Sequence, residues 1–436
     1  MAVPTIISQM ILLLYNLADT WFIGRTGDPY MVAASSLGLT VYLTLAALAN
    51  VFGVGGGSLM VRLAGEKKTE DAEKVSSYSV ALSAGVSLAF SLLVLCFLTP
   101  LLKMLGAGEN TLEYAKQYLF TSVVIGGVPT VLSMSMPQLL RNAGYSKEAG
   151  FGVGFGSLLN IALDPLFMFV LLPKGREVLG AGIATMLANM VSMLYFIIIF
   201  RKLRGKTVLR MPAKRIRLEK EQKRSLYSVG VPSAVAVFLY DLVTIVVNRL
   251  TVAYGDIPLA AMGIVLKLER IPINIGLGIC LGMVPLIAYN FGAGDHERMQ
   301  RFFSLARNAL LALSCACAVL FRIFSGPLIG LFIDNEATVR QGAEFLRGRC
   351  FSLPFMMIGY LVVNYMNAVN KGRVSFLLSI IRHVVLIIPI MLIMNALFAL
   401  TGLIWSQLTA DLLSALAAYL IYRRVNSGII GKEART

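Results

Sequence analysis

The chain has 436 residues, of which 57% are hydrophobic and 14% are charged, and its mean hydropathy is +0.76. Soluble proteins carry roughly 25% charged residues, so this composition excludes a soluble protein and indicates a membrane protein. The formal net charge of +16 would also suit a nucleic-acid-binding surface. In so apolar a chain, most of this positive charge is expected in loops on the cytoplasmic side of the membrane. We therefore expect anionic lipid rather than nucleic acid as the partner.

Apolar stretches recur along the whole chain, separated by charged residues, Gly and Pro. Most approach or exceed the roughly 20 residues that a helix needs to cross a bilayer. The second and eighth are longer, so we expect them to tilt or protrude. The first has no basic region before it and no cleavage site, so we interpret it as a true helix and not a signal peptide. The twelve predicted spans are 4–24, 31–62, 77–102, 116–140, 150–173, 179–200, 225–251, 257–291, 302–324, 343–367, 374–397 and 400–422.

The first span carries a carboxylate, Asp19, and no Lys or Arg precedes it. An acid at the centre of a membrane helix costs about 2.5–3.5 kcal/mol, so such residues usually line a cavity, pair with a partner or relay protons. The alternative is a position near the helix end, from which the side chain reaches the interface. Asp is short, however, and Arg25 marks a later exit from the membrane. We therefore expect Asp19 to have a function.

The fifth span carries an amide and an acid four residues apart, Asn160 and Asp164. This spacing places both on one helix face, where they could share one ion. Pro165 follows directly and removes the hydrogen bond to the Ile161 carbonyl, which then needs water, a cation or a neighbouring donor. A kink beside an acid is typical of transport sites. An ordinary proline bend, with Asn160 bonded to another helix, is the alternative.

The loop after the sixth span is strongly basic, since nine Lys or Arg lie between Arg201 and Arg224 against only Glu219 and Glu221. The positive-inside rule places this loop in the cytoplasm. Six spans return the chain to its starting side, so we expect both termini to be cytoplasmic. The predicted location is the plasma (inner) membrane, with multiple crossings.

The two halves of the chain repeat each other. Pro4 precedes the pair 27–28 (Gly-Asp) by the same distance that separates Pro232 from the pair 255–256 (Gly-Asp). Further matches follow in order, 65–70 with 292–297 and 142–151 with 367–376. The predicted fold is an all-α membrane protein with twelve transmembrane helices in two six-helix bundles related by a parallel pseudo-two-fold repeat. The expected domains are an N-terminal bundle over 1–200, a basic cytoplasmic linker over 201–224 and a C-terminal bundle over 225–436.

A parallel repeat of this kind suggests alternating access, because two such bundles can enclose a cleft that opens to either side. The halves differ at their starts. An amphipathic run, 218–230, precedes Pro232, whereas only three residues precede Pro4. By symmetry we expect about a dozen further residues before Met1.

Several stretches resemble the multidrug and toxic compound extrusion (MATE) family nearly end to end. They are Pro4 with Gln9, 15–24 (YNLADTWFIG), 140–144 (LRNAG), 160–165 (NIALDP), 180–185 (GAGIAT), 292–294 (GAG) and Trp405 with Asp411. The family implies a twelve-helix secondary antiporter that exports cationic, amphipathic drugs and metabolites in exchange for protons or sodium ions. A lipid or lipid-linked precursor flippase of the same superfamily is the alternative. Extra helices or a strongly cationic central groove would favour it, and only Lys267, Arg270 and Arg382 hint at such a groove.

The resemblance to the DinF-like branch of the family also implies a cation- or proton-coupling site in the first bundle, at Asp19, Asn160, Asp164 and Thr185. Hard oxygen ligands could hold Na⁺ at the first three of these, whereas two nearby acids in a dry pocket could carry a proton. The sequence does not choose between H⁺ and Na⁺ as the coupling ion. Pro4 and Pro165 are the candidate hinges, with Pro4 near the bend of the first helix.

The candidate residues of the substrate cavity are Gln9, Tyr15, Asn16, Met134, Asp241, Lys267 and Arg270. Tyr15 and Met134 would offer a pliable apolar and cation–π surface. The branch typified by NorM proteins places an acid like Asp241 in the seventh span, but its second acid is replaced here by amides at 364, 367 and 370. Asp241 is therefore either a substrate contact or a paired structural acid. Lys267 and Arg270 share a face, which could line the outward mouth, neutralise buried carboxylates or reach the outer interface.

Nothing in the sequence indicates an enzyme. The two His residues, 296 and 383, lie on different segments without metal-binding spacing, and the five Cys residues have no ligand pattern. The glycine runs 53–57 and 276–278 lie inside apolar helices, so they predict close helix packing and not nucleotide loops. For the pair Arg382 and His383 we favour a structural Arg over a proton relay. We expect no cofactor, small cationic drugs or metabolites as substrates, and a monomer.

Overall fold

The computed structural model describes residues 2–212 and 217–433, and the side chains of Thr20, Pro29, Asp241 and residues 430–433 lie outside that description. The described residues form helices and no β-strand, apart from one isolated bridge between Arg204 and Thr207. Backbone contacts divide the chain into two compact units, and the boundary lies between Ala234 and Val235, inside α9 (Lys220–Val252). The bundle limits expected from the sequence stay a prediction.

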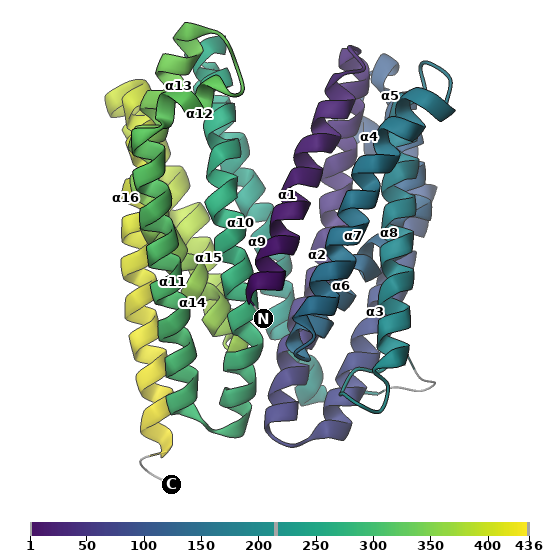
Figure 1. The fold of residues 1–436 in the computed structure, drawn as a ribbon, viewed down its shortest axis with the longest axis vertical. Helices are drawn as coiled ribbons and strands as arrows, with labels where there is room; N and C mark the ends of the chain where they lie inside the picture. The colour runs from purple at the N-terminus through teal and green to yellow at the C-terminus, as the bar shows by residue number, and fades with distance from the viewer. Residues whose placement is uncertain (1, 213–216, 434–436) are drawn as a thin grey trace. The chain divides into compact units, whose positions relative to one another are not determined.

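The first unit contains helices that lie side by side in Figure 1, with α1 against α7, α2 against α3 and α6, and α7 against α8. The helix α2 begins where the sequence provides a cap, since Asp28 Oδ1 accepts a hydrogen bond from the Tyr30 N–H at 2.8 Å. The bounds before α9 are α1 (Ala2–Gly24), α2 (Pro29–Gly65), α3 (Thr69–Cys96), α4 (Leu98–Met104), α5 (Glu109–Leu119), η1 (Phe120–Ile125), α6 (Gly127–Asn142), α7 (Ser146–Pro165), η2 (Leu166–Leu171) and α8 (Glu177–Lys202).

The second unit is also built from helices, and local residues explain where some of them begin and end. Gly294 follows α10 with a φ of 76°, a left-handed conformation that glycine adopts without strain. Asp295 then caps α11 by accepting from the Arg298 N–H at 2.9 Å. The bounds after α9 are α10 (Asp256–Ala293), α11 (His296–Ile323), α12 (Ser325–Gly330), α13 (Glu336–Arg349), η3 (Cys350–Ser352), α14 (Leu353–Ala368), α15 (Gly372–Ile380), η4 (Ile381–Ile387) and α16 (Ile388–Glu433).

The prediction of twelve spans is confirmed. Ten continuous helical segments in the described residues are long and apolar enough to cross a membrane, and α5–η1 with α6 form an eleventh that is bent by 54°. The last segment, Gly372–Ile429, has 58 residues, and a straight helix of that length would measure about 87 Å, far more than one crossing. It reverses at Ala399, whose φ is 50°, so it supplies two spans.

The reversal inside α16 depends on a small residue. A Cβ added at Gly402 would lie 1.9 Å from the Met394 carbonyl oxygen, so the backbones on either side of Ala399 touch. The predicted third and tenth spans are less regular than expected, because Phe97 separates α3 from α4 and the 3₁₀ turn η3 separates α13 from α14.

The glycine run of α2 allows its neighbours to approach closely, as the sequence predicted. Added Cβ atoms at Gly53, Gly56 and Gly57 would lie 2.8 Å or less from side chains of α3 and α6. At Gly55 the neighbour is the backbone of α9, with the Leu226 carbonyl oxygen at 2.5 Å. The first turns of α9 therefore pack against α2, within the first unit.

Gly230 of α9 supports a test of this packing. A Cβ there would lie 2.1 Å from the Val51 carbonyl oxygen, a backbone atom that cannot rotate away. We expect G230A to lower the free energy of unfolding by about 1–3 kcal/mol, measured as thermal unfolding of the purified protein in detergent. The control is G263A, because nothing lies within 4 Å of its added Cβ. That variant should match or slightly exceed the wild type, and an equal loss in both variants would contradict the packing argument.

Candidate ion and substrate site

Three of the four predicted coupling residues come together where α7 packs against α8. Asp164 is fully buried, and Asn160 and Thr185 are only 3% and 2% exposed. The Asn160 amide satisfies both neighbours when its nitrogen donates to Asp164 Oδ2 at 2.7 Å and its oxygen accepts from the Thr185 N–H at 3.1 Å. In the opposite orientation its nitrogen lies 3.3 Å from Thr185 Oγ1. We favour the first arrangement because it leaves no acceptor facing an acceptor.

The fourth residue, Asp19, lies on α1, which packs along α7. Its Oδ1 atom is buried and accepts no hydrogen bond from the described residues. The Asp19 and Asp164 carboxyl groups are close enough to interact electrostatically. A buried carboxylate oxygen without a donor is costly, and two like charges in an apolar surrounding repel each other. A proton or a cation between these helices would relieve both costs.

The donor set fits a proton or a hard monovalent cation better than a transition metal. Within the described residues, no three His, Cys, Asp or Glu side chains gather in a metal-binding group. The coupling residues instead offer oxygen atoms, from the carboxylates of Asp19 and Asp164, the amide of Asn160 and the hydroxyl of Thr185. Such oxygens suit hard cations.

The end of α7 changes its helical pattern beside this site. Pro165 is the last residue of α7, and the chain continues directly as the π-helix η2. Proline lacks the N–H that an α-helix needs, and single π turns are frequent at functional sites. The other candidate hinge, Pro4, is tied to α7, since a Cβ at Gly150 would lie 2.7 Å from the Pro4 carbonyl oxygen. The hinge roles stay predictions.

Three tyrosines interact electrostatically with one or both of the acids. Tyr15 and Tyr118 both interact electrostatically with Asp19 and Asp164, and Tyr42 interacts with Asp19. Tyr118 is well buried, and its ring occupies the space beside Gly38 on α2, 2.3 Å from where a Cβ would lie. Sequence reasoning named Tyr15 and missed Tyr118.

A hydrogen-bonded set of small polar side chains continues from Tyr42, and sequence reasoning missed it. Tyr42 is hydrogen-bonded to the side chain of Asn189. Asn189 Nδ2 donates to Thr130 Oγ1 at 3.1 Å, and Ser133 Oγ donates to Asn189 Oδ1 at 3.0 Å. The signal was available, because Asn, Ser and Thr within apolar spans commonly bond across helices.

The other candidates of the first unit lie in different surroundings. Gln9 is half-buried and Asn16 is exposed. Met134 packs on an apolar cluster that includes Leu45 and Val131, which is the setting of a core side chain. Whether any of them contacts a substrate stays a prediction.

The candidate cavity residues of the second unit lie in different surroundings. The side chain of Asp241 lies outside the described residues. Lys267 is exposed, while the guanidinium of Arg270 lies 6.0 Å from the centre of the Tyr240 ring. Between them in sequence, Glu269 is buried and forms a bidentate pair with Arg349, with Nε to Oε1 at 2.7 Å and Nη2 to Oε2 at 2.9 Å. Sequence reasoning missed this pair.

A second buried ion pair involves Arg382. Its Nε and Nη2 atoms both lie 3.0 Å from Asp411 Oδ1, and Gln407 Nε2 donates to Asp411 Oδ2 at 2.7 Å. The guanidinium also lies 4.7 Å from the centre of the Tyr360 ring. The adjacent His383 Nδ1 lies 2.9 Å from the Ser379 carbonyl oxygen. These contacts support a structural role for Arg382, which sequence reasoning favoured over a proton relay.

Curated proteins similar to this chain are named multidrug export protein MepA. The protein from Staphylococcus saprophyticus is 32% identical over 421 residues, which cover 96% of this chain and 91% of the relative. The protein from Staphylococcus aureus strain MRSA252 has the same identity and coverage.

Solved structures similar to this chain are MATE transporters. A crystal structure of MATE in complex with MaL6 has a TM-score of 0.93 at 22% identity and covers 99% of this chain and 96% of its own. An outward-facing multidrug resistance MATE family transporter of the MOP superfamily has a TM-score of 0.92 at 22% identity and covers 99% and 95%. At these identities the likeness shows only the fold, with its twelve transmembrane helices.

The profile of the MatE family matches the chain twice, over residues 4–166 and 232–393. The two matches begin at Pro4 and Pro232, the residues from which the internal repeat was recognised. The sequence relatives and the fold agree with the profile. The chain therefore belongs to the MatE family of multi-pass membrane transporters.

Proposed function

We propose that this protein is a secondary multidrug efflux antiporter, which exports cationic amphipathic compounds in exchange for H⁺ or Na⁺ by alternating access. The observation that carries the proposal is a buried Asp19 oxygen that has no donor among the described residues and lies near the set formed by Asp164, Asn160 and Thr185. The names of the curated relatives support the drug class. Both termini would lie in the cytoplasm of a plasma-membrane protein, because the basic segment 201–224 follows the positive-inside rule.

The contrast between the two units supports placing the coupling ion in the first. In the second unit, the buried acids Glu269 and Asp411 are each paired with an Arg. In the first, no Lys or Arg among the described residues forms an ion pair with Asp19 or Asp164. An acid already neutralised by Arg has little need of a cation. The uncompensated pair is where an ion would bind with the larger gain.

The physical basis of antiport would be competition for negative charge. A cationic drug and the coupling ion both gain from the two carboxylates, and bringing both into one apolar site costs Coulomb repulsion. The aromatic faces of Tyr15, Tyr42 and Tyr118 would add cation–π attraction for a flat cation. Export of a monovalent cation against 100 mV costs about 2.3 kcal/mol, and inward movement of the ion would supply it.

The test uses the full chain purified into liposomes, with ethidium followed by fluorescence under a proton gradient and, separately, under a sodium gradient. We expect ethidium movement to respond to one of the two gradients and to stop when the matching ionophore dissipates it. Protein-free liposomes provide the baseline. The same vesicles carrying a fluorescent phospholipid test the alternative, a lipid flippase. Lipid translocation without any ethidium response would overturn the antiporter proposal.

A further inference from the structure

A cavity of about 950 Å³ lies in the first unit where α3 begins and α8 ends, under the segment that leaves α8. None of the coupling-site residues Asp19, Asn160, Asp164 and Thr185 lines it. Four residues of α3 line one side, Glu70, Glu73, Lys74 and Ser77. The other described lining residues are Phe200, Arg201, Arg204, Arg210, Met211, Pro212 and Arg217. Because both helices are membrane spans, their ends place this cavity at the level of the lipid headgroups.

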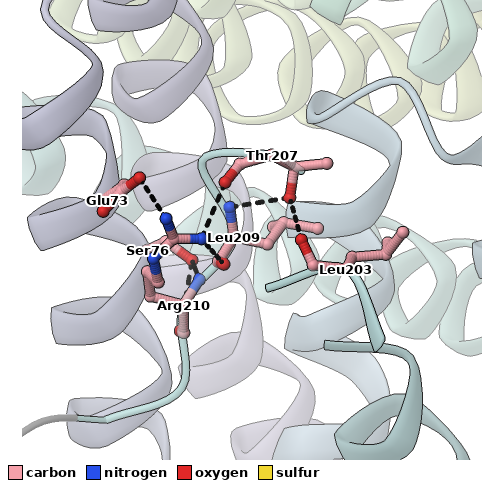
Figure 2. A network of polar contacts seen from close by, with 6 residues as sticks. All are labelled: Glu73, Ser76, Leu203, Thr207, Leu209 and Arg210. Atoms are coloured by element: carbon pink, nitrogen blue, oxygen red, sulfur yellow. Dashed lines mark hydrogen bonds and ion pairs between the residues drawn. The ribbon is translucent and has the colours of Figure 1, made fainter. Parts of the chain in front are cut away.

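The segment over the cavity is held in place by hydrogen bonds, as Figure 2 shows. The Arg210 N–H donates to Ser76 Oγ at 3.1 Å, and Ser77 Oγ donates to the Met211 carbonyl oxygen at 2.6 Å. The Arg210 guanidinium donates to the carbonyl oxygens of Thr207 and Leu209 at 2.9 Å and 3.0 Å and pairs with Glu73. Arg210 is therefore a positioning residue whose charge is already compensated.

The remaining charges of the cavity do not balance. Lys74 pairs with Glu70 at 2.9 Å, which leaves three cations among the described lining residues, Arg201, Arg204 and Arg217. Their side chains are exposed and form no hydrogen bond or ion pair with other described residues. Three like charges around one cavity repel each other. An anion bound between the three guanidinium groups would attract all of them and offset their mutual repulsion.

The chemistry of the lining selects the kind of anion. Guanidinium groups present planar forks of N–H donors that match the oxygens of a phosphate, singly or in pairs. Phe200, Met211 and Pro212 also line the cavity and supply an apolar side. A phosphate joined to an apolar body satisfies both kinds of wall. Basic pockets between membrane helices on the cytoplasmic side bind anionic headgroups in this way.

We propose that Arg201, Arg204 and Arg217 bind the phosphate group of an anionic phospholipid from the cytoplasmic leaflet, in the cavity between α3 and the segment after α8. The choice of leaflet rests on the proposed orientation. The binding itself does not depend on which drug or ion is transported. Free phosphate offers the same chemistry without the apolar part, so the test separates the two sources.

The experiment titrates phosphatidylglycerol or phosphatidylcholine onto the purified full chain and counts bound lipids by native mass spectrometry. We expect the wild type to prefer phosphatidylglycerol by roughly tenfold or more, because each basic residue near a surface adds to the attraction for an anionic lipid. The triple variant R201Q/R204Q/R217Q should lose that preference. The control R373Q/R423Q/R424Q removes the same charge from exposed arginines elsewhere and should keep it.

Inorganic phosphate at matched ionic strength is the second arm, followed by thermal unfolding in detergent. A lipid site predicts little stabilisation by free phosphate and competition only at high concentration. Equal binding of both lipids by the wild type, together with stabilisation by phosphate that the triple variant lacks, would assign the cavity to free phosphate and overturn the lipid source. Unchanged lipid preference in the triple variant would overturn the site. If the triple variant does not fold, R201Q and R217Q singly carry the test, each with a smaller loss of preference.

Discussion

Replacing Asp19 with Asn is expected to abolish ion-driven ethidium efflux while the protein still folds and reaches the membrane. The substitution removes the charge and keeps the size of the side chain. It also breaks no hydrogen bond at Oδ1, because that atom accepts none from the described residues. A polar contact with a charged group contributes about 1.5–3 kcal/mol, against about 0.5–1.5 kcal/mol for a neutral one, so ion affinity should fall by roughly tenfold. The measurement is ethidium transport in liposomes under the gradient that drives the wild type.

The matched control is D28N, which makes the same chemical change outside the site. Asp28 caps α2 through its Oδ1 atom, and Asn caps a helix about as well as Asp. Its efflux should equal that of the wild type at the same amount of protein. D164N should resemble D19N in transport, although its amide oxygen can still accept from Asn160. Efflux that persists in D19N would overturn the coupling role of that residue and leave Asp164 as the remaining acid.

The number of spans was readable from the sequence because bilayer thickness fixes the length of an apolar helix. The reversal in α16 was harder to place. Ala399 has a φ of 50°, a conformation that alanine does not favour. At 294–295 the turn was predictable, because Gly adopts a positive φ without strain and Asp is a preferred helix N-cap. The π segments were equally hidden, except η2, which follows Pro165. Local residue chemistry predicts a break only where Pro, Gly or a cap marks it.

The site was predictable within one helix and less so between helices. Asn160 and Asp164 share a face because of the helical repeat, and the contact between them follows from spacing alone. Thr185 was placed by resemblance to a family motif. Glu269 and Arg349 were missed because they lie on different helices. Which residues meet across two membrane helices depends on the close packing of small residues, and no periodicity in one segment contains that information.

Replacing Glu269 with Gln is expected to destabilise the second unit by about 3–5 kcal/mol, because it leaves the Arg349 charge buried without its partner. Both side chains are well buried, at 10% and 4% exposed, so water cannot take the place of the lost carboxylate. Thermal unfolding of the purified protein in detergent measures the effect. The control is E297Q, which breaks the pair of Glu297 with Arg301 on α11. Those side chains are 78% and 76% exposed, so the loss should stay below about 1 kcal/mol.

The double variant E269M/R349M separates stability from function. It removes both charges together, and apolar replacements of a buried pair are often neutral or stabilising by about 1–4 kcal/mol. We therefore expect it to unfold at a higher temperature than E269Q. If it also transports ethidium like the wild type, the pair only holds α10 against α13. If it folds and does not transport, the pair is needed in another conformation of the transport cycle. In the conformation described here, the two side chains only bind each other. A double variant as unstable as E269Q would contradict the assignment of the loss to an unpaired charge.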